Sequence, residues 1–280
     1  MRNKKPKKLK ISHVFIYLFL SVMSIVMIFP LYWMLRGAFM ESPLDVMDVT
    51  KFLPNKFDFG NFTEAFSSAP FGQYLINTLY LVVVNVTGVL LSSSLVAFGF
   101  SRIKFRYREL FFGAMMATMM IPGTVLQIPQ FVGWVTVGAY DTMIPLTLPA
   151  WFGSVTYVFM LRQFFMTLPK EYDEAARIDG ASYFRIYWQI ILPLSKPALL
   201  TVGVFTFMGV WNDFFGPLIY LPDEKNWTLA LGLSNFMGQY SSDWHLLMAA
   251  SSVLVIPMIV IYFFAQRSFI EGITFTGVKG

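Results

Sequence analysis

Residues 168–193 read LPKEYDEAARIDGASYFRIYWQIILP, and this is the most informative stretch of the chain. Pro169 suits a first helical position, and three carboxylates follow where the helix dipole stabilises negative charge: Glu171, Asp173 and Glu174. Gly180 is suited to end this helix in a left-handed conformation, and Ser182 can cap the next one. The stretch therefore predicts two short helices with a sharp break. Taken alone, it could also be a plain connector at a membrane surface.

The composition favours a membrane protein. Of the 280 residues, 56% are apolar and only 13% are charged, whereas an average soluble domain has about 25% charged residues. A soluble fold would have too little charge to coat its surface, but an apolar surface suits lipid. The sequence has no cysteine, which excludes disulfides and thiol nucleophiles. The two histidines, His13 and His245, lie too far apart in the sequence to form a metal site by themselves.

Six apolar stretches are long enough to cross a hydrocarbon core, which takes about 20 helical residues. They are approximately 12–35, 73–100, 110–132, 142–164, 194–221 and 244–266. The basic head before the first stretch resembles a signal peptide, but the apolar run is too long and no small-residue cleavage site follows. We therefore expect a retained anchor and an all-α polytopic membrane protein with six transmembrane helices. Residues 1–280 are expected to form a single transmembrane domain.

The positions of Lys and Arg predict the orientation. The N-terminal head has six, residues 101–109 have four, residues 162–196 have five and the C-terminal tail has two. The predicted outer loops hold only four of the 21 basic residues: Arg36, Lys51, Lys56 and Lys225. Positive residues collect in the cytoplasm, so both termini are expected inside, as an even number of spans also requires. The net charge of +5 is then a topology signal and not a nucleic-acid footprint.

Prolines interrupt most of the predicted spans. A proline inside a helix frees a carbonyl group and kinks the axis, and freed groups are tolerated in lipid only against protein or a wet cavity. These prolines indicate either ordinary packing kinks or, as we favour, a translocation path: Pro122, Pro129, Pro145, Pro149, Pro217 and Pro257. The largest outer loop, 36–72, is expected to be partly ordered, with an amphipathic stretch at 61–66.

The stretch 168–193 resembles the EAA loop of permease subunits of type I ATP-binding-cassette (ABC) importers. That pattern is Glu-Ala-Ala, three residues, Gly, nine residues, Ile-x-Leu-Pro. It falls here on residues 174–176, Gly180 and residues 190–193 with every spacing intact. Further segments are similar to the carbohydrate branch of these permeases, in particular to the smaller permease of the maltose system: residues 97–102, 120–123, 161–165, 175–182, and 266–269 through 277–280.

The resemblance implies an inner-membrane permease subunit that forms half of a path for a sugar or oligosaccharide. It implies a homologous second permease, two cytoplasmic ATPase subunits and an extracytoplasmic solute-binding protein. The ATPases would use ATP and Mg²⁺, while this chain binds no cofactor and has no phosphate-binding Gly-x-x-x-x-Gly-Lys-Ser/Thr loop. The resemblance places five residues in the helix that couples to the ATPase: Glu174, Ala175, Ala176, Asp179 and Gly180.

Polar residues inside the spans are candidates for the substrate path. Trp211, Asn212 and Asp213 in the fifth span offer a stacking face and hydrogen-bonding groups suited to sugar hydroxyls. A carboxylate at this depth costs roughly 3 kcal/mol on insertion scales, so it usually faces protein or water. We favour a structural role, in which Asp213 clamps a neighbouring helix or lies near the outer interface, over direct contact with the ligand. The same alternatives hold for four polar residues of the second span: Asn77, Thr78, Asn85 and Thr87.

Two other classes of protein explain less of the sequence. A secondary transporter or channel would account for the spans and prolines but not for the complete EAA pattern. An intramembrane enzyme would need a nucleophile with a partner; Gly232-Leu233-Ser234 faintly resembles a serine-protease turn, yet a simple turn in an external loop is expected there. The identity of the sugar cannot be read from the sequence.

Overall fold

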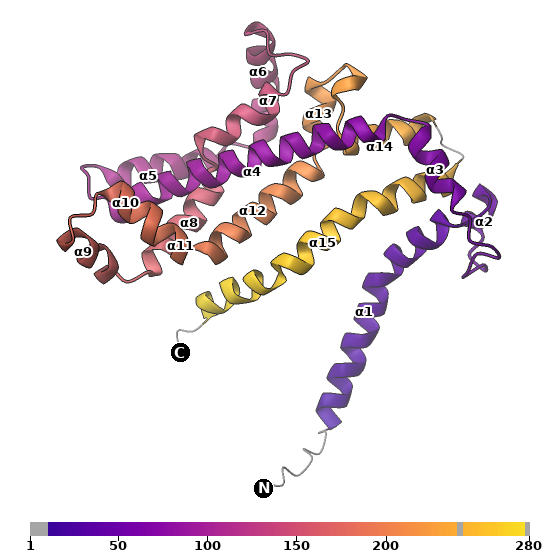
Figure 1. Ribbon diagram of the computed structural model, residues 1–280, viewed down its shortest axis with the longest axis horizontal. Helices are drawn as coiled ribbons and strands as arrows, with labels where there is room; N and C mark the ends of the chain where they lie inside the picture. The colour runs from indigo at the N-terminus through magenta and orange to yellow at the C-terminus, as the bar shows by residue number, and fades with distance from the viewer. Residues whose placement is uncertain (1–10, 240–242, 278–280) are drawn as a thin grey trace. The chain divides into compact units, whose positions relative to one another are not determined.

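The computed structural model describes residues 11–239 and 243–277, and in these residues the chain is helical, with no strand (Figure 1). Its α-helices are α1 (Ile11–Ala38), α2 (Pro43–Met47), α3 (Gly60–Ser67), α4 (Phe71–Arg102), α5 (Arg108–Ala117), α6 (Gly123–Thr136), α7 (Ile144–Thr147), α8 (Val155–Thr167), α9 (Glu171–Ile178), α10 (Tyr183–Ile186), α11 (Leu192–Leu194), α12 (Lys196–Trp211), α13 (Phe215–Tyr220), α14 (Leu229–Gln239) and α15 (Trp244–Gly277).

Among the described residues, four helical segments are long and apolar enough to cross a membrane, and the number rises to six if each of two bent pairs is one span. The four are His13–Ala38, Phe71–Arg102, Ile144–Thr167 and Trp244–Phe264. The bent pairs are Arg108–Met120 with Gly123–Thr136, and Tyr183–Leu194 with Lys196–Trp211. These segments overlap the six stretches expected from the sequence, although their placement in a membrane remains a prediction.

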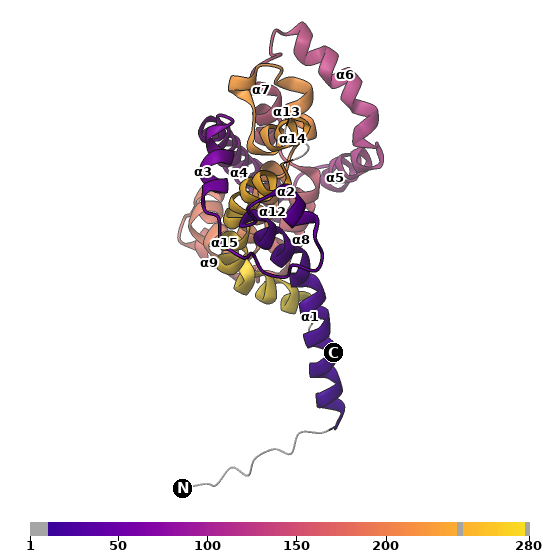
Figure 2. The same ribbon diagram turned by 90° about the vertical axis from the view of Figure 1, so that its right-hand side faces the viewer.

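The first bent pair turns by 94° at Pro122. Ile121 is extended, with φ −82° and ψ 116°, as expected for a residue before proline, and α6 starts directly after Pro122. Figure 2 shows α5 and α6 on either side of this bend. Pro129 and Pro257, in contrast, lie inside α6 and α15 without ending them. These prolines therefore differ in their effect on the helix axis. Pro122, which directly precedes α6, lies at a sharp bend, whereas Pro129 and Pro257 lie within continuous helices.

The fifth expected span, 194–221, is not one continuous helix. The chain bends by 79° before Lys196, and α12 ends at Trp211. Residues 212–214 separate α12 from the short α13. A side chain that bonds its own backbone competes with helical pairing, and Asn212 and Asp213 do so here, as described below. Residues 232–234 also differ from expectation, because they belong to α14 and form no turn.

One compact unit comprises residues 1–69 and 236–254. Arg36 organises the loop between α1 and α3: its side chain is buried and donates hydrogen bonds to the main-chain carbonyls of Asp45, Val46, Asp48 and Lys51. The Asn61 amide donates to the carbonyls of Ala38 and Met40 at 3.0 and 2.8 Å, which fixes α3. The expectation of a partly ordered loop is confirmed, and the amphipathic stretch at 61–66 lies within α3. Arg36 therefore has a structural role beyond its contribution to the charge count.

The other unit comprises residues 70–235 and 255–280. In this unit α4 packs along α8 and α12 (Figure 1). Small residues on α4 permit close approach: a Cβ added at Gly88 would lie 2.9 Å from the Trp151 indole nitrogen, and the Ser92 hydroxyl donates to the Ala150 carbonyl at 3.0 Å. The buried core extends from these helices to α10, including Phe98, Leu161, Phe165, Ile186 and Ile191. This core supports the loop that contains α9.

Candidate functional site

Helix α9 and the turn after it have the geometry that the sequence predicts. The three carboxylates lie in the first turn of α9, and Gly180 follows the helix with φ +75°. The N–H of Gly180 donates to the carbonyl of Arg177 at 3.0 Å, and the N–H of Ala181 donates to that of Ala176 at 2.9 Å. This pair of bonds is a Schellman motif. The expected left-handed glycine is confirmed, whereas α9 begins at Glu171, two residues after Pro169.

The next helix is capped as expected. The Ser182 hydroxyl accepts a hydrogen bond from the N–H of Arg185 at 3.3 Å, at the start of α10. A π-helical turn, Tyr187–Ile191, then leads into α11. The Tyr187 and Ser94 hydroxyls are 2.8 Å apart, which ties this turn to α4. The loop is thus two short helices with a sharp break, fixed to the body of its own unit.

The five residues assigned to coupling divide into an exposed group and one packed residue. Ala176 is half-buried and packs against the core that includes Ile186. The other four are exposed: Glu174, Ala175, Asp179 and Gly180. The side chains of Ile178 and Tyr172 are 87% and 50% exposed. An isoleucine is rarely exposed to this extent on the surface of a protein. Tyr172, Ala175 and Ile178 recur every third residue and so share a helix face. The sequence reasoning missed Tyr172 and Ile178, although their spacing from Ala175 signals this apolar stripe.

Arg102, at the end of α4, anchors the loop. Its Nη2 donates to the carbonyls of Phe165 and Leu168 at 2.8 and 2.9 Å, and its Nη1 lies 3.2 Å from Oδ2 of Asp173. The side chains of Arg102 and Asp173 are 4% and 17% exposed. Burial raises the pKa of the Asp173 carboxyl above its ordinary value, and Arg102 opposes this shift. From the sequence alone, Arg102 appeared only as one of the cytoplasmic basic residues.

Arg162, in α8, makes a second set of contacts between helices near the start of the loop. One of its terminal nitrogens lies 3.1 Å from both carboxylate oxygens of Glu109, and its guanidinium lies 4.0 Å from the centre of the Phe112 ring. Its Nε donates to the Phe100 carbonyl at 3.3 Å. Arg162 therefore joins α4, α5 and α8 just before the loop begins.

The three candidate path residues lie together at the break between α12 and α13, where each has a local partner. Trp211 is buried and stacks on Phe207 with ring centres 5.3 Å apart. The Asn212 amide donates to the Met208 carbonyl of its own helix at 2.8 Å. Oδ1 of Asp213 accepts from the N–H of Gly216 at 3.0 Å, so this carboxylate caps the start of α13. A role in ligand contact remains a prediction.

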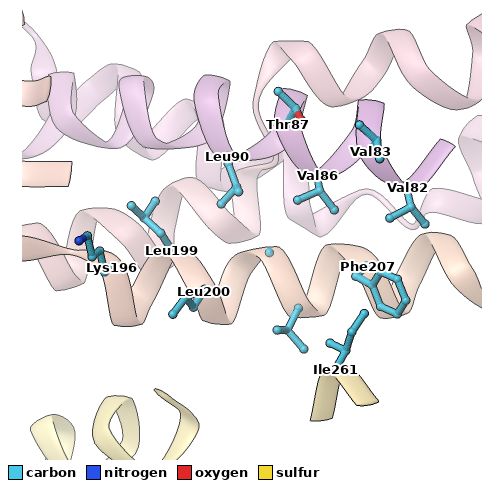
Figure 3. Close-up of a pocket in the computed structure, with 12 residues that line it drawn as sticks. Val82, Val83, Val86, Thr87, Leu90, Lys196, Leu199, Leu200, Phe207 and Ile261 are labelled. Atoms are coloured by element: carbon cyan, nitrogen blue, oxygen red, sulfur yellow. The ribbon is translucent and has the colours of Figure 1, made fainter. Parts of the chain in front are cut away.

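Three polar residues of α4 hold neighbouring segments. The Asn77 amide donates to the carbonyls of Lys225 and Trp227 at 2.8 and 2.9 Å. The Thr78 hydroxyl accepts from the N–H of Leu229 at 2.9 Å, and the Asn85 amide donates to the Leu146 carbonyl at 2.9 Å. These contacts favour the structural alternative for all three. Thr87, in contrast, borders a mainly apolar groove of about 580 Å³ between α4, α12 and α15, which Lys196 and Phe207 also line (Figure 3).

The described part of the chain contains no group of three or more His, Asp or Glu residues that could hold a metal ion. Residues 88–274 match the family described as "Binding-protein-dependent transport system inner membrane component". This match covers more than half of the chain, so the chain belongs to that family, the permease subunits of ABC importers, and is not an enzyme.

Individual relatives agree with this assignment. The chain is 31% identical to the arabinooligosaccharides transport system permease protein AraQ of Bacillus subtilis, over 94% of both chains. It is 33% identical to the sn-glycerol-3-phosphate transport system permease protein UgpE of Escherichia coli O1:K1 / APEC, over 98% of both. Its fold is similar to a chain of a bacterial ABC transporter involved in the import of the acidic polysaccharide alginate, with a TM-score of 0.81, 22% identity and coverage of 95% and 99%.

Proposed function

We propose that this subunit forms half of a translocation path for a sugar or oligosaccharide. We also propose that α9 transmits to this path the conformational change that ATP hydrolysis drives in the ATPase subunits. The observation that carries the proposal is the exposed apolar stripe on α9, rigidly backed by Arg102 and the core. An exposed Ile178 on a projecting helix suits a groove on a partner protein. The relative AraQ, named for arabinooligosaccharides, supports a carbohydrate substrate.

The partners follow from the family. The chain would pair with a second, homologous permease, bind two cytoplasmic ATPase subunits that use ATP and Mg²⁺, and receive substrate from an extracytoplasmic binding protein. A solved bacterial alginate ABC transporter, to which this chain is similar in fold, is described in complex with an alginate pentasaccharide-bound periplasmic protein. With both termini in the cytoplasm, α9 and Gly180 lie on the ATPase side of the inner membrane.

A phosphorylated polyol is the second candidate for the substrate. The observation that favours it is the 33% identity to UgpE, a permease named for sn-glycerol-3-phosphate, over nearly the whole chain. The three candidate path residues do not favour an anion, because Asp213 contributes a carboxylate and neither Trp211 nor Asn212 is basic. The oligosaccharide therefore remains our first proposal. Competition of each substrate class for uptake distinguishes the two.

The decisive experiment introduces a large side chain at each of two adjacent alanines and compares the two variants in the reconstituted importer. Ala175 is exposed and Ala176 packs against the core. Ala175→Trp is expected to leave the loop folded while it abolishes ATPase binding and sugar uptake, because the added ring blocks the docking face. Ala176→Trp is expected to disorder the loop itself, seen as faster hydrogen exchange. Normal uptake and normal ATP use by Ala175→Trp would show that α9 is only a connector.

A further inference from the structure

A cavity of about 270 Å³ lies behind α9, between the end of α4, the start of α5 and α10. Five cationic side chains line it: Arg102, Lys104, Arg108, Lys170 and Arg177. Two carboxylates, Asp173 and Glu174, also line it, so the lining has a surplus of three positive charges. The cations come from two segments that are distant in the sequence, residues 102–108 and residues 170–177, and the fold brings them together.

Not all of this charge is neutralised within the chain. Arg102 pairs with Asp173, Arg108 lies 2.8 Å from Oε1 of Glu109, and Arg177 lies over the Tyr183 ring. Lys104 and Lys170, in contrast, form no salt bridge with any residue that the structure describes. Two lysines of the cavity lining, one from each of the two segments, are thus available to an anion.

A buried donor also lacks an acceptor. The Nε of Arg102 makes no hydrogen bond within the described structure, although its side chain is only 4% exposed and lines the cavity. A buried N–H without a partner costs free energy, so such atoms generally indicate a missing partner. The Tyr183 hydroxyl accepts a hydrogen bond from Arg177, which leaves its own proton free to be donated into the cavity.

We propose that this cavity binds a phosphate group, and that in the membrane this group belongs to the headgroup of an anionic phospholipid. A phosphate has several charged oxygens for donors that converge from different directions, here Lys104, Lys170 and Arg102. Basic pockets beside transmembrane helices on the cytoplasmic side suit anionic headgroups. Arg102 ends the apolar helix α4, and Phe98 and Ile186 give the cavity an apolar wall. The bound phosphate would link the α4–α5 connection to α9 and steady the coupling loop.

The test uses the assembled importer in phosphatidylcholine nanodiscs with increasing phosphatidylglycerol, and measures the phosphatidylglycerol retained after purification. Lys104→Gln and Lys170→Gln are each expected to weaken retention about fivefold, which corresponds to roughly 1 kcal/mol per basic residue. Arg185→Gln is the matched control, because Arg185 lies on the same loop but bonds Gln189 and does not line the cavity. Equal retention by the double lysine variant and by Arg185→Gln would overturn the proposal.

A second arm distinguishes the source of the phosphate. In nanodiscs of phosphatidylcholine alone, inorganic phosphate is expected to slow hydrogen exchange in residues 170–186 less than phosphatidylglycerol does. Equal protection by inorganic phosphate would leave the phosphate site standing and overturn its assignment to lipid. The lipid assignment rests on the orientation proposed above, but lipid retention is measured without transport. Failure of one proposal is therefore separable from failure of the other.

Discussion

The guanidinium of Arg102 lies 3.2 Å from the carboxylate of Asp173, and this contact fastens the proposed coupling helix to the last residue of α4. The same guanidinium donates to two main-chain carbonyls at the end of α8 and just beyond it. One side chain therefore joins the end of one apolar helix, the exit from a second and the start of α9. A displacement of α9 by a partner would reach α4 and α8 through it.

Replacing Arg102 by methionine is expected to loosen α9 without preventing membrane insertion. The change leaves Asp173 and two carbonyls without their donor, and breaking a buried pair in this way costs on the order of 3 kcal/mol. Hydrogen exchange in residues 165–180 is expected to accelerate, with loss of coupled ATP hydrolysis. Arg106→Met is the control, because Arg106 is exposed and stacks only on Tyr107. Equal rates of hydrogen exchange in the two variants would show that Arg102 does not stabilise the position of α9.

The Asp173 carboxyl predicts a pH dependence of opposite sign to that of a typical paired aspartate. Burial raises its folded-state pKa above 3.8, so the folded loop binds a proton more tightly than the unfolded chain. Its contribution to stability is therefore present below 3.8 and is lost as pH rises through the folded pKa. The protection of α9 against hydrogen exchange, taken relative to the intrinsic exchange rate at each pH, is expected to fall over that window. Asp173→Asn should remove this dependence, and an unchanged profile in that variant would assign it to another group.

Gly180 is expected to tolerate asparagine better than valine. Its φ of +75° is the constraint, since no atom lies within 4 Å of the position that a Cβ would take. Valine in this left-handed conformation costs roughly 1–2 kcal/mol, while asparagine adopts it more readily. Gly180→Val should insert normally yet show little substrate-stimulated ATP hydrolysis, and Gly180→Asn should retain most of it. Equal activities would mean that the turn geometry is not needed for coupling.

The sequence predicts the loop because its determinants are local. The Schellman turn at Gly180 and the cap at Ser182 depend on residues a few positions apart, so the one-dimensional pattern contains them. The Arg102–Asp173 contact does not, because α8 must first fold back along α4 before the two residues meet. For the same reason the sequence does not predict that Arg36, which it indicates only as a basic residue of a predicted outer loop, bonds the main chain of the loop between α1 and α3.

Helix continuity through polar residues is also hard to predict from the sequence. The hydropathy of residues 194–221 favours one long helix, but side chains at 212 and 213 bond nearby main-chain groups and separate α12 from α13. At residues 232–234 the opposite error occurs, since a glycine and a serine suggested a turn within what is α14. There the missing Cβ of Gly232 makes room for Tyr74, whose ring carbons would lie 2.3 Å from an added Cβ. This packing explains the glycine without a turn.

Labelling of single introduced cysteines tests the proposed orientation. The chain has no cysteine of its own, so no other residue reacts with a thiol reagent. Ile178 is 87% exposed and Phe57 is 54% exposed, so both positions accept a reagent once it reaches them. In intact cells an impermeant maleimide is expected to label Phe57→Cys and to spare Ile178→Cys. Permeabilised cells provide the control, since both should then react. External labelling of Ile178→Cys would reverse the orientation, and with it the ATPase partnership.

Substitutions of Asp213 distinguish a structural role of this residue in the fifth span from direct contact with the ligand. Its carboxylate accepts the Gly216 N–H at 3.0 Å, a cap whose loss in Asp213→Ala is expected to cost about 1 kcal/mol. Asp213→Asn keeps an acceptor oxygen but removes the charge, so it should assemble with the second permease almost normally while Asp213→Ala assembles poorly. Thr201→Val is the control, because the Thr201 hydroxyl bonds only the Pro197 carbonyl of its own helix and is not a candidate path residue. Subunit ratio after purification and uptake of competing sugars are measured together. If both Asp213 variants assemble normally but change sugar preference, the carboxylate contacts substrate and the capping role is secondary.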